Sequence, residues 1–326
     1  MASKKIVVLG TGGTIAGLAP DPGQTGDGQP TYRAGQVGVE RLLANIPALK
    51  GLPLLAEQVA QVDSKDMGPT VWQTLATRCA HWLSDDDVQG LVITHGTDTL
   101  EETAYFLHRV LAPEKPVVLT CAMRPADALA PDGPQNLVDA VAVARSSGAQ
   151  GVVAVCAGQV HGAMDVAKVH PYRLDAFSSG DAGPIAWVEE GQLRRLRPWP
   201  VAADRRAGQL AAAVAQHSPT TWPFVEIVIN HAGADGRLVD ALVGAGARGL
   251  VAAGTGNGTL SQALEAALLR ARELGVEVVR STRCASGQVV PHRGDAIAAT
   301  PGLSPVKARV ALLLDLLARL SGAPAL

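Results

Sequence analysis

The chain has 326 residues, of which 47% are hydrophobic and 18% are charged. These values allow one large or two moderate domains with well-buried cores, and they exclude disorder over most of the length. The 28 Lys and Arg residues nearly balance the 30 Asp and Glu residues, which gives a net charge of -2. Because there is no basic block and aromatic residues are few, we expect no nucleic-acid partner.

The four cysteines lie far apart in the sequence, at Cys79, Cys121, Cys156 and Cys284. Without a CxxC pair or the framework of a small disulfide-bonded domain, they favour a reducing compartment. The apolar run near the N-terminus, residues 6–9, is too short for a signal peptide or a membrane span. We therefore expect a cytoplasmic protein with no membrane association, and a periplasmic one only if a signal peptide had been removed.

Short apolar runs rich in β-branched residues alternate with longer segments whose apolar residues recur every three or four positions. The runs predict buried strands at residues 6–9, 91–94, 117–120 and 152–156. The longer segments predict helices at residues 98–112 and 134–147. Such alternation is typical of a parallel, doubly wound sheet.

Composition changes around residues 196–221, which contain several prolines, an Arg pair and a short Ala run. We interpret residues 198–221 as an interdomain linker. Beyond it, the pattern predicts strands at residues 224–229, 250–253 and 276–279 and a final helix at residues 304–320. The predicted fold is α/β, with a larger N-terminal domain (1–197) built on a doubly wound, mostly parallel sheet and a smaller C-terminal α/β domain (222–326).

Two glycine-rich segments invite a nucleotide-binding interpretation that their spacing does not support. Residues 10–17 place Ile15 where a dinucleotide fingerprint requires a small residue. Residues 254–259 lack the lysine of a phosphate-binding loop. The histidines form no HExxH motif and no tight cluster with cysteines or carboxylates. We therefore expect neither a cofactor nor a metal.

Hydroxyl and carboxylate residues follow several of the predicted strands, where a parallel sheet places its ligand crevice. Thr14 follows the first strand, Ser64 follows the run at residues 54–62, and Thr97 and Asp98 follow the strand at 91–94. A threonine framed by glycines suits a nucleophile beside backbone N–H groups, although threonine also caps helices. Asp98 likewise has the simpler interpretation of a helix N-cap.

Two segments resemble the signatures of the bacterial-type L-asparaginases, amidohydrolases with a threonine nucleophile. They are Gly-Gly-Thr-Ile-Ala-Gly at residues 12–17 and Thr-His-Gly-Thr-Asp-Thr-Leu-Glu-Glu-Thr-Ala-Tyr at residues 94–105. Segments similar to other family motifs follow in the family's order at residues 165–168, 254–259 and 307–309. The resemblance implies the two-domain α/β fold and hydrolysis of L-asparagine to L-aspartate and ammonia through a threonine acyl-enzyme.

The resemblance also implies roles for individual catalytic residues. Thr14 is the expected nucleophile, and Tyr32 matches the tyrosine of the family's flexible lid. Lys168 is expected to polarise Thr97, while Asp98 is expected to hold the substrate's α-amino group. Because an unperturbed lysine has a pKa of about 10.4, Lys168 can accept a proton at neutral pH only if its surroundings lower that value.

Other positions match the family's substrate-binding residues. Ser64 matches the residue that binds the α-carboxylate, and Gly13 and Gly96 frame the turns expected to lie against the substrate. Asn257 matches a position that reaches toward a neighbouring subunit's site. The family forms homotetramers from intimate dimers, and we expect the same assembly.

The sequence departs from the best-known members at three places, one of which is the long, Pro- and Gly-rich loop at residues 18–31. Lys65 stands where many members carry Gln, and we expect its side chain to point away from the substrate's ammonium group. Residues 286–299 contain no Glu, whereas several members donate a glutamate from this region to the adjacent subunit.

Three alternative functions stay open. The first is a dual glutaminase-asparaginase, because one methylene in a pocket discriminates by only about 1–3 kcal/mol. The second is a subunit of a tRNA amidotransferase, which would bring an RNA partner. The third is a non-catalytic small-ligand-binding module, which would be expected to have lost one of the four residues Thr14, Thr97, Asp98 and Lys168.

Overall fold

The computed structural model describes residues 4–17, 36–201 and 206–322. The chain divides into two compact units, residues 1–205 and 206–326, and each unit has its own sheet with parallel strands. Within the described residues, no helix is both long enough and apolar enough to cross a bilayer.

The first unit is built around a sheet of eight strands, as far as the described residues show. Its strands are β1 (Lys5–Gly12), β2 (Leu54–Val62), β3 (Val88–Thr94), β4 (Pro116–Thr120), β5 (Gly151–Cys156), β6 (Gln159–Gly162), β9 (Ala186–Glu189) and β10 (Gln192–Arg195). The spatial order is β10-β9-β6-β5-β4-β3-β1-β2. Strands β1 to β5 pair in parallel, while β6, β9 and β10 pair antiparallel at one side.

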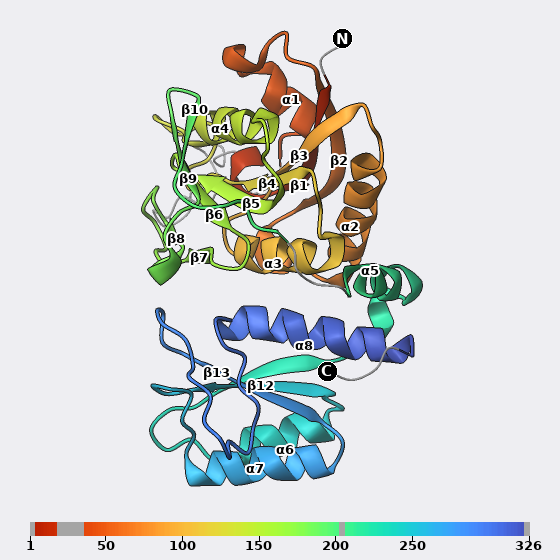
Figure 1. The fold of residues 1–326 in the computed structure, drawn as a ribbon, viewed down its shortest axis with the longest axis vertical. Coiled ribbons are helices and arrows are strands. Elements are labelled where there is room, and N and C mark those ends of the chain that lie inside the picture. Colours follow the sequence, from red (N-terminus) through yellow and green to blue (C-terminus); the bar gives the residue numbers. More distant parts are fainter. Residues whose placement is uncertain (1–3, 18–35, 202–205, 323–326) are drawn as a thin grey trace, which may run out of the picture. The chain divides into compact units, whose positions relative to one another are not determined.

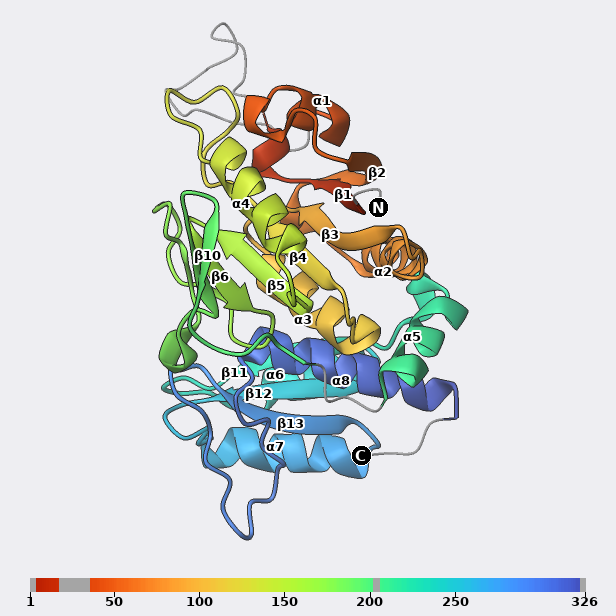
Figure 2. The ribbon, with the colours of Figure 1, turned by 45° about the horizontal axis from the view of Figure 1, so that its top comes forward.

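Helices cover both faces of this sheet. They are α1 (Val39–Ala44), α2 (Pro69–Leu83), α3 (Leu100–Leu111) and α4 (Gly133–Arg145), accompanied by the 3-10 turns η1 (Thr14–Ala16), η3 (Pro47–Leu49), η4 (Ser64–Asp66) and η5 (Gly180–Ala182). Figure 1 shows α1 and α4 on one face and α2 and α3 on the other, and Figure 2 shows α4 lying across β4 and β5.

The strand sequences reflect burial on both faces. Ile6 and Val8 of β1 pack with Leu137 of α4 in one hydrophobic cluster, while Val7 and Leu9, which alternate with them, are also fully buried. Because successive side chains of a strand point to opposite faces, a strand covered on both sides must be apolar throughout. A separate two-stranded sheet, β7 (Ala167–Lys168) with β8 (Phe177–Ser178), completes the first unit.

The second unit has three parallel strands, again among the described residues. Its elements are α5 (Ala207–Gln216), η6 (Pro219–Thr221), β11 (Val225–Ile229), α6 (Arg237–Gly244), β12 (Gly249–Gly254), α7 (Gln262–Glu273), β13 (Glu277–Thr282) and α8 (Pro305–Leu320). Figure 1 shows α6 and α7 on one face of this sheet and α8 on the other. Leu250 of β12 and Leu264 and Leu268 of α7 belong to its core.

The observed architecture confirms the predicted α/β class with a larger N-terminal and a smaller C-terminal unit. The domain limits 1–197 and 222–326 stay predictions. The segment interpreted as a linker, residues 198–221, contains the helix α5, whose Leu210, Ala213 and Val214 are buried. A short Ala run with apolar residues three and four positions apart favours a helix over an extended connection.

Candidate active site

The first candidate turn lies where β1 ends. Gly12 and Gly13 have φ values of 107° and 82°, in the left-handed region that glycine favours. Thr14 then opens η1, and its side chain is half-buried. After the two glycines, a single 3-10 turn of three residues forms. The N–H of Gly13 donates to the carbonyl of Val62 at 3.0 Å, which ties this turn to the end of β2.

The strand order brings this turn beside the one that follows β3. The parallel strands run β2-β1-β3-β4-β5 across the sheet, so the winding direction reverses between β1 and β3. Ligands of open α/β sheets bind outside the carboxyl ends of the strands at such a reversal. Thr14 follows β1, and Thr97 and Asp98 follow β3, so these predicted site residues lie at that crevice.

The two turns touch through their glycines. A methyl group on Gly13 would collide with the backbone of His95 and Gly96, and one on Gly96 would collide with the side chain of Ser64. The turns that carry Thr14, Ser64 and Thr97 therefore meet at one place, and each glycine is required there by close approach.

Lys168 joins the same place from β7. Its ammonium nitrogen Nζ donates to Thr97 Oγ1 at 2.7 Å and to Asp98 Oδ1 at 2.6 Å. Thr97 Oγ1 lies 3.4 Å from the same carboxylate oxygen. The side chain of Lys168 is 17% exposed and that of Asp98 is 52% exposed. The trio therefore combines a shielded cation with a carboxylate that a solute can reach.

Asp98 does not act as a helix cap. Helix α3 begins at Leu100, its N-cap residue is Thr99, and no side chain caps it. The backbone N–H of Asp98 donates to Ser64 Oγ at 3.1 Å, and Thr99 Oγ1 donates to the carbonyl of Ser64 at 2.7 Å. Ser64 is buried, and its hydroxyl keeps a proton to donate, because a hydroxyl is both donor and acceptor.

His95 is a fully buried residue that shapes this turn. Its backbone N–H donates to the carbonyl of Thr120, and its ring Nδ1 lies 2.7 Å from the carbonyl oxygen of Gly96. Because a carbonyl only accepts, Nδ1 carries the proton. Burial lowers the pKa of His95 to about 4, although the bond to Gly96 opposes the shift. The imidazole is therefore neutral at physiological pH and holds the turn by a directed hydrogen bond.

Lys65, next to Ser64, is engaged by its own neighbours. Its ammonium donates to Asp63 at 3.0 Å and to Asp66 at 2.9 Å, and the side chain is 61% exposed. These two carboxylates raise the pKa of Lys65 above its usual value. They also compensate its charge beside the trio of Lys168, Thr97 and Asp98.

Tyr32 and Asn257 are the two remaining predicted residues. Tyr32 lies outside the described residues. Asn257 belongs to the second unit, where its Nδ2 donates to the carbonyl of Val290 at 2.9 Å and its Oδ1 accepts from the N–H of Val290 at 2.7 Å. Its amide thus holds the segment after β13.

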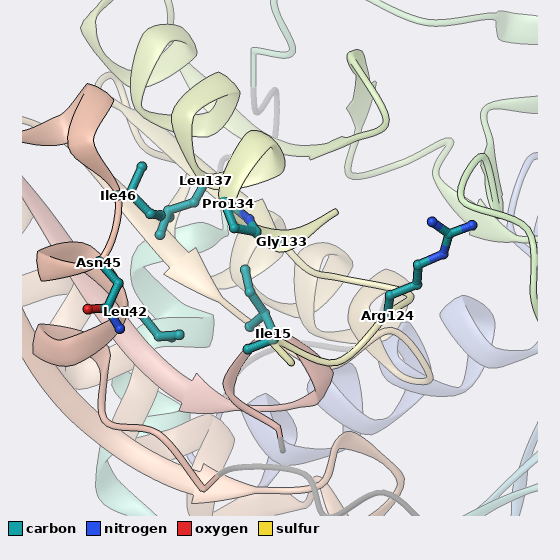
Figure 3. A pocket seen from close by; sticks show the side chains of 9 residues that line it. Ile15, Leu42, Asn45, Ile46, Arg124, Gly133, Pro134 and Leu137 are labelled. Carbon is teal, nitrogen blue, oxygen red and sulfur yellow. The ribbon is translucent and has the colours of Figure 1, made fainter. Parts of the chain in front are cut away.

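An apolar cavity of about 200 Å³ lies behind the Thr14 turn. Figure 3 shows Ile15, Leu42, Ile46 and Leu137 gathered around it, whereas the guanidinium of Arg124 points away. The cavity is formed by η1, the region of α1 and the start of α4. It borders the residue after Thr14 and lies on the apolar side of the turn.

Sequence reasoning missed one further contact in the cluster. Glu101 lies in the first turn of α3, and its carboxylate accepts the backbone N–H of Lys168 at 3.5 Å. No local pattern reports this, because β7 has two residues and lies 67 positions away. Among the described residues, no three His, Cys, Asp or Glu side chains come together as metal ligands.

Comparison with known families agrees with the residue patterns. Residues 5–200 match the family model described as "Asparaginase, N-terminal", and residues 224–322 match the "Glutaminase/Asparaginase C-terminal domain". Together these matches cover most of the chain.

Individual relatives show the same similarity. The chain is 38% identical over 320 residues to "L-asparaginase 2" of Bacillus subtilis, covering 95% of this chain and 82% of that protein. It is 37% identical over 288 residues to "Glutaminase-asparaginase" of Pseudomonas fluorescens, covering 87% and 77%. A solved structure, a probable cytoplasmic L-asparaginase from Campylobacter jejuni, matches with a TM-score of 0.82 and 32% identity over 96% of this chain and 95% of that one.

Proposed function

The chain belongs to the asparaginase family, and we propose that it hydrolyses L-asparagine to L-aspartate and ammonia through an acyl-enzyme on Thr14. The observation that carries this proposal is the contact of Lys168 with Thr97 and Asp98 beside the glycine-framed Thr14 turn. A carboxamide is a poor electrophile, so its hydrolysis needs an activated nucleophile and donors for the developing oxyanion.

In the first half-reaction, Thr14 Oγ1 attacks the side-chain carbonyl carbon of asparagine. Backbone N–H groups of the turns at Thr14 and Thr97 stabilise the oxyanion. The carbon–nitrogen bond then breaks, and the leaving nitrogen takes up the proton that the Thr14 hydroxyl lost on attack and departs as ammonia. In the second half-reaction, water attacks the ester on Thr14 and releases aspartate. We assign Tyr32 the role of the lid tyrosine, which approaches Thr14 when the lid closes.

Asp98 and Ser64 are assigned to the ends of the substrate that do not react. The exposed part of the Asp98 carboxylate accepts the α-ammonium, while its Oδ1 stays on Lys168. The Ser64 hydroxyl, already accepting from Asp98, donates to the α-carboxylate. The Lys168 ammonium polarises the Thr97 hydroxyl, which orients the water of the second half-reaction.

The second candidate is a dual glutaminase-asparaginase. The similarity to the "Glutaminase-asparaginase" of Pseudomonas fluorescens, which is 37% identical to this chain, favours it. Glutamine is longer by one methylene, and a pocket rejects one methylene by only about 10–200-fold.

Assembly and location are part of the same proposal. We assign a homotetramer built from intimate dimers, with Asn257 contributing near a neighbouring subunit's site, and a cytoplasmic location. Light scattering on the full chain checks the assembly, since a monomer would contradict it.

The central experiment measures ammonia release from L-asparagine and L-glutamine by the full chain and by Thr14→Ala. We expect hydrolysis of asparagine, lost by several orders of magnitude in the variant. Thr77→Ala is the matched control, because Thr77 is an exposed helix threonine that bonds only its own helix, at the carbonyl of Gln73. Thr14→Ala retaining a tenth of the turnover would refute the nucleophile assignment, and equal rates on both amides would establish the dual enzyme.

A further inference from the structure

Two cysteines face each other at the carboxyl ends of β4 and β5. These strands pair in parallel, with Leu119 opposite Ala154 and Thr120 opposite Val155. The next positions are Cys121, which directly follows β4, and Cys156, the last residue of β5, so the two cysteines come opposite each other. Their sulfurs are 3.0 Å apart and hydrogen-bonded, and both side chains are buried.

The backbone around this thiol pair is held firmly. The side-chain Nδ2 of Asn136 donates to the carbonyl of Cys121 at 2.9 Å, and its Oδ1 accepts from the N–H of Ala157 at 3.0 Å. Thr120 Oγ1 donates to the carbonyl of Val155 at 2.9 Å. Neighbouring parallel strands lie about 4.8 Å apart, within the Cα separation of about 4.4–6.8 Å that a disulfide spans. The spacing of the two strands is therefore compatible with a disulfide.

The pair also adjoins the candidate active site. Thr120, which precedes Cys121, is paired with Thr94 at the end of β3, and its carbonyl accepts the N–H of His95. The hydrogen bond from Cys156 and burial raise the pKa of the Cys121 thiol well above its usual value, while the nearby charge of Lys168 opposes the rise. Cys121 directly follows Thr120, whose carbonyl holds the backbone of the turn that carries Thr97 and Asp98.

The other cysteines lack these features. Cys79 is buried in α2, and Cys284 is exposed in the second unit. They are internal references for the reaction with an oxidant: Cys79 is as buried as the pair but, among the described residues, has no partner thiol beside it, and Cys284 is more accessible than the pair.

We propose that Cys121 and Cys156 are a redox modification site, a thiol pair that closes into one disulfide when hydrogen peroxide or another small two-electron oxidant reaches it, and that closure slows hydrolysis at the adjacent site. The effect on turnover rests on the proposed function, whereas the disulfide does not.

The chemistry balances with peroxide as the named oxidant. One sulfur, as a thiolate, attacks a peroxide oxygen; the oxygen–oxygen bond breaks, and the hydroxide that leaves takes a proton to become water. The second sulfur then attacks the resulting sulfenic acid, forming the sulfur–sulfur bond and releasing a second water. Two thiols lose two electrons and two protons in all, and one peroxide becomes two waters.

Closure should reach the turn of Thr97 and Asp98 through the backbone. A disulfide holds its sulfurs about 2.05 Å apart, so the pair must close by about 1 Å. That displacement acts on Cys121 and hence on Thr120, whose carbonyl fixes His95. Misplacement of catalytic groups by about 1 Å can lower the rate by up to about 100-fold. Because the cysteines act on the catalytic groups only through Thr120 and His95, we expect the rate of hydrolysis to fall by about tenfold.

The reaction should be slow at neutral pH and faster in alkali. Because the thiolate is the nucleophile, the rate should rise about tenfold for each pH unit below the thiol pKa. Cys79 distinguishes reaction of the folded chain from reaction of an unfolded fraction. It is buried in α2, so peroxide should modify it only in chains that have unfolded.

The experiment uses the full chain carrying Cys284→Ser, which removes the exposed thiol, and treats it with hydrogen peroxide under native conditions. Peptide mapping without reductant should find the peptides of Cys121 and Cys156 linked, with Cys79 unmodified, and ammonia release should fall about tenfold and return with dithiothreitol. The matched variant adds Cys156→Ala, and its activity should not respond to peroxide.

Two results would overturn the inference. One is the absence of the linkage, with Cys121 or Cys156 unreacted or oxidised singly to sulfinic acid. The other is a linkage that leaves turnover unchanged, which would refute the effect on the site. A chain that releases no ammonia before oxidation would refute the proposed function instead, and the peptide map would still decide the disulfide.

Discussion

Gly13 and Gly96 approach each other so closely that a methyl group on Gly13 would overlap the backbone of Gly96. One glycine follows β1 and the other follows β3, so two turns that touch lie 83 positions apart in the sequence. This contact sets the spacing between Thr14 on one turn and Thr97 on the other.

Gly13→Ala should therefore abolish most of the amide hydrolysis. The added methyl group must push the two turns apart, and a misplaced nucleophile is expected to lower kcat/KM by about 100-fold or more. Gly51→Ala is the matched control, because Gly51 has nearly the same φ, +83° against +82°, with nothing within 4 Å of the new methyl group. Both variants place an alanine at positive φ, but Gly13 also has a ψ of −175°, a conformation that almost only glycine adopts, so Gly13→Ala adds backbone strain to the clash. Ammonia release and thermal unfolding compare the two, and equal activity would contradict the packing argument.

The Lys168 and Thr97 side chains should act as one unit. Lys168→Met and Thr97→Val each remove one partner of the 2.7 Å hydrogen bond, and each should lower kcat by about 100-fold or more. Because the second change removes an interaction already lost, the double variant should be close to the worse single variant. Steady-state kinetics of the three variants make the comparison. Losses that multiply would show that the two residues contribute independently.

The buried His95 should make stability depend on pH. In the unfolded chain the ring takes up a proton as the pH falls through about 6.5, whereas in the folded chain it does so only near 4. The unfolded state is therefore favoured progressively as the pH falls through this window, and the contribution of His95 to the free energy of unfolding falls by up to about 3 kcal/mol. Urea unfolding at pH 7 and pH 4.5 should show a smaller loss in His95→Gln than in the wild-type chain.

His231 supplies the control for this measurement. Its Nδ1 lies 2.9 Å from the carbonyl of the following residue, Ala232, as that of His95 does, but the side chain is exposed. Urea unfolding of His231→Gln at the same two pH values shows how much of the effect of His95→Gln comes from losing any histidine with this local contact, and how much comes from burial. A His95→Gln chain with the wild-type dependence on pH would contradict the assignment of the neutral ring.

The fold was predictable where burial governs the sequence. Strands β1, β3, β4 and β5 are covered on both faces, so they must be apolar throughout and appear as continuous runs. The antiparallel strands were not predicted, because β10 has only four residues and carries two arginines. Helix α5 was missed because the surrounding prolines and arginines dominated the composition of its segment.

The candidate site was predictable as a set of residues but not as a geometry. Motifs and spacing identified Ser64, Thr97, Asp98 and Lys168, whose contacts the structure displays. The hydrogen bond from Asp98 to Ser64, the bond from Lys168 to Glu101 and the pairing of Cys121 with Cys156 join residues 34 to 67 positions apart. Only strand order and register bring such residues together, and neither can be obtained from local pattern.

The final prediction concerns Asn257 in the second unit. Its Oδ1 accepts the N–H of Val290 at 2.7 Å and its Nδ2 donates to the carbonyl of the same residue, so the side chain closes the segment after β13. Asn257→Ala removes both bonds and should make the Val290 amide exchange faster by about fivefold or more, for a bond of about 1 kcal/mol. Asn257→Asp keeps the acceptor oxygen and should keep most of the protection. Hydrogen exchange measured by mass spectrometry checks both variants, with the KM for asparagine determined alongside. Unchanged exchange in Asn257→Ala with a raised KM would show that the residue serves the substrate and not its own segment.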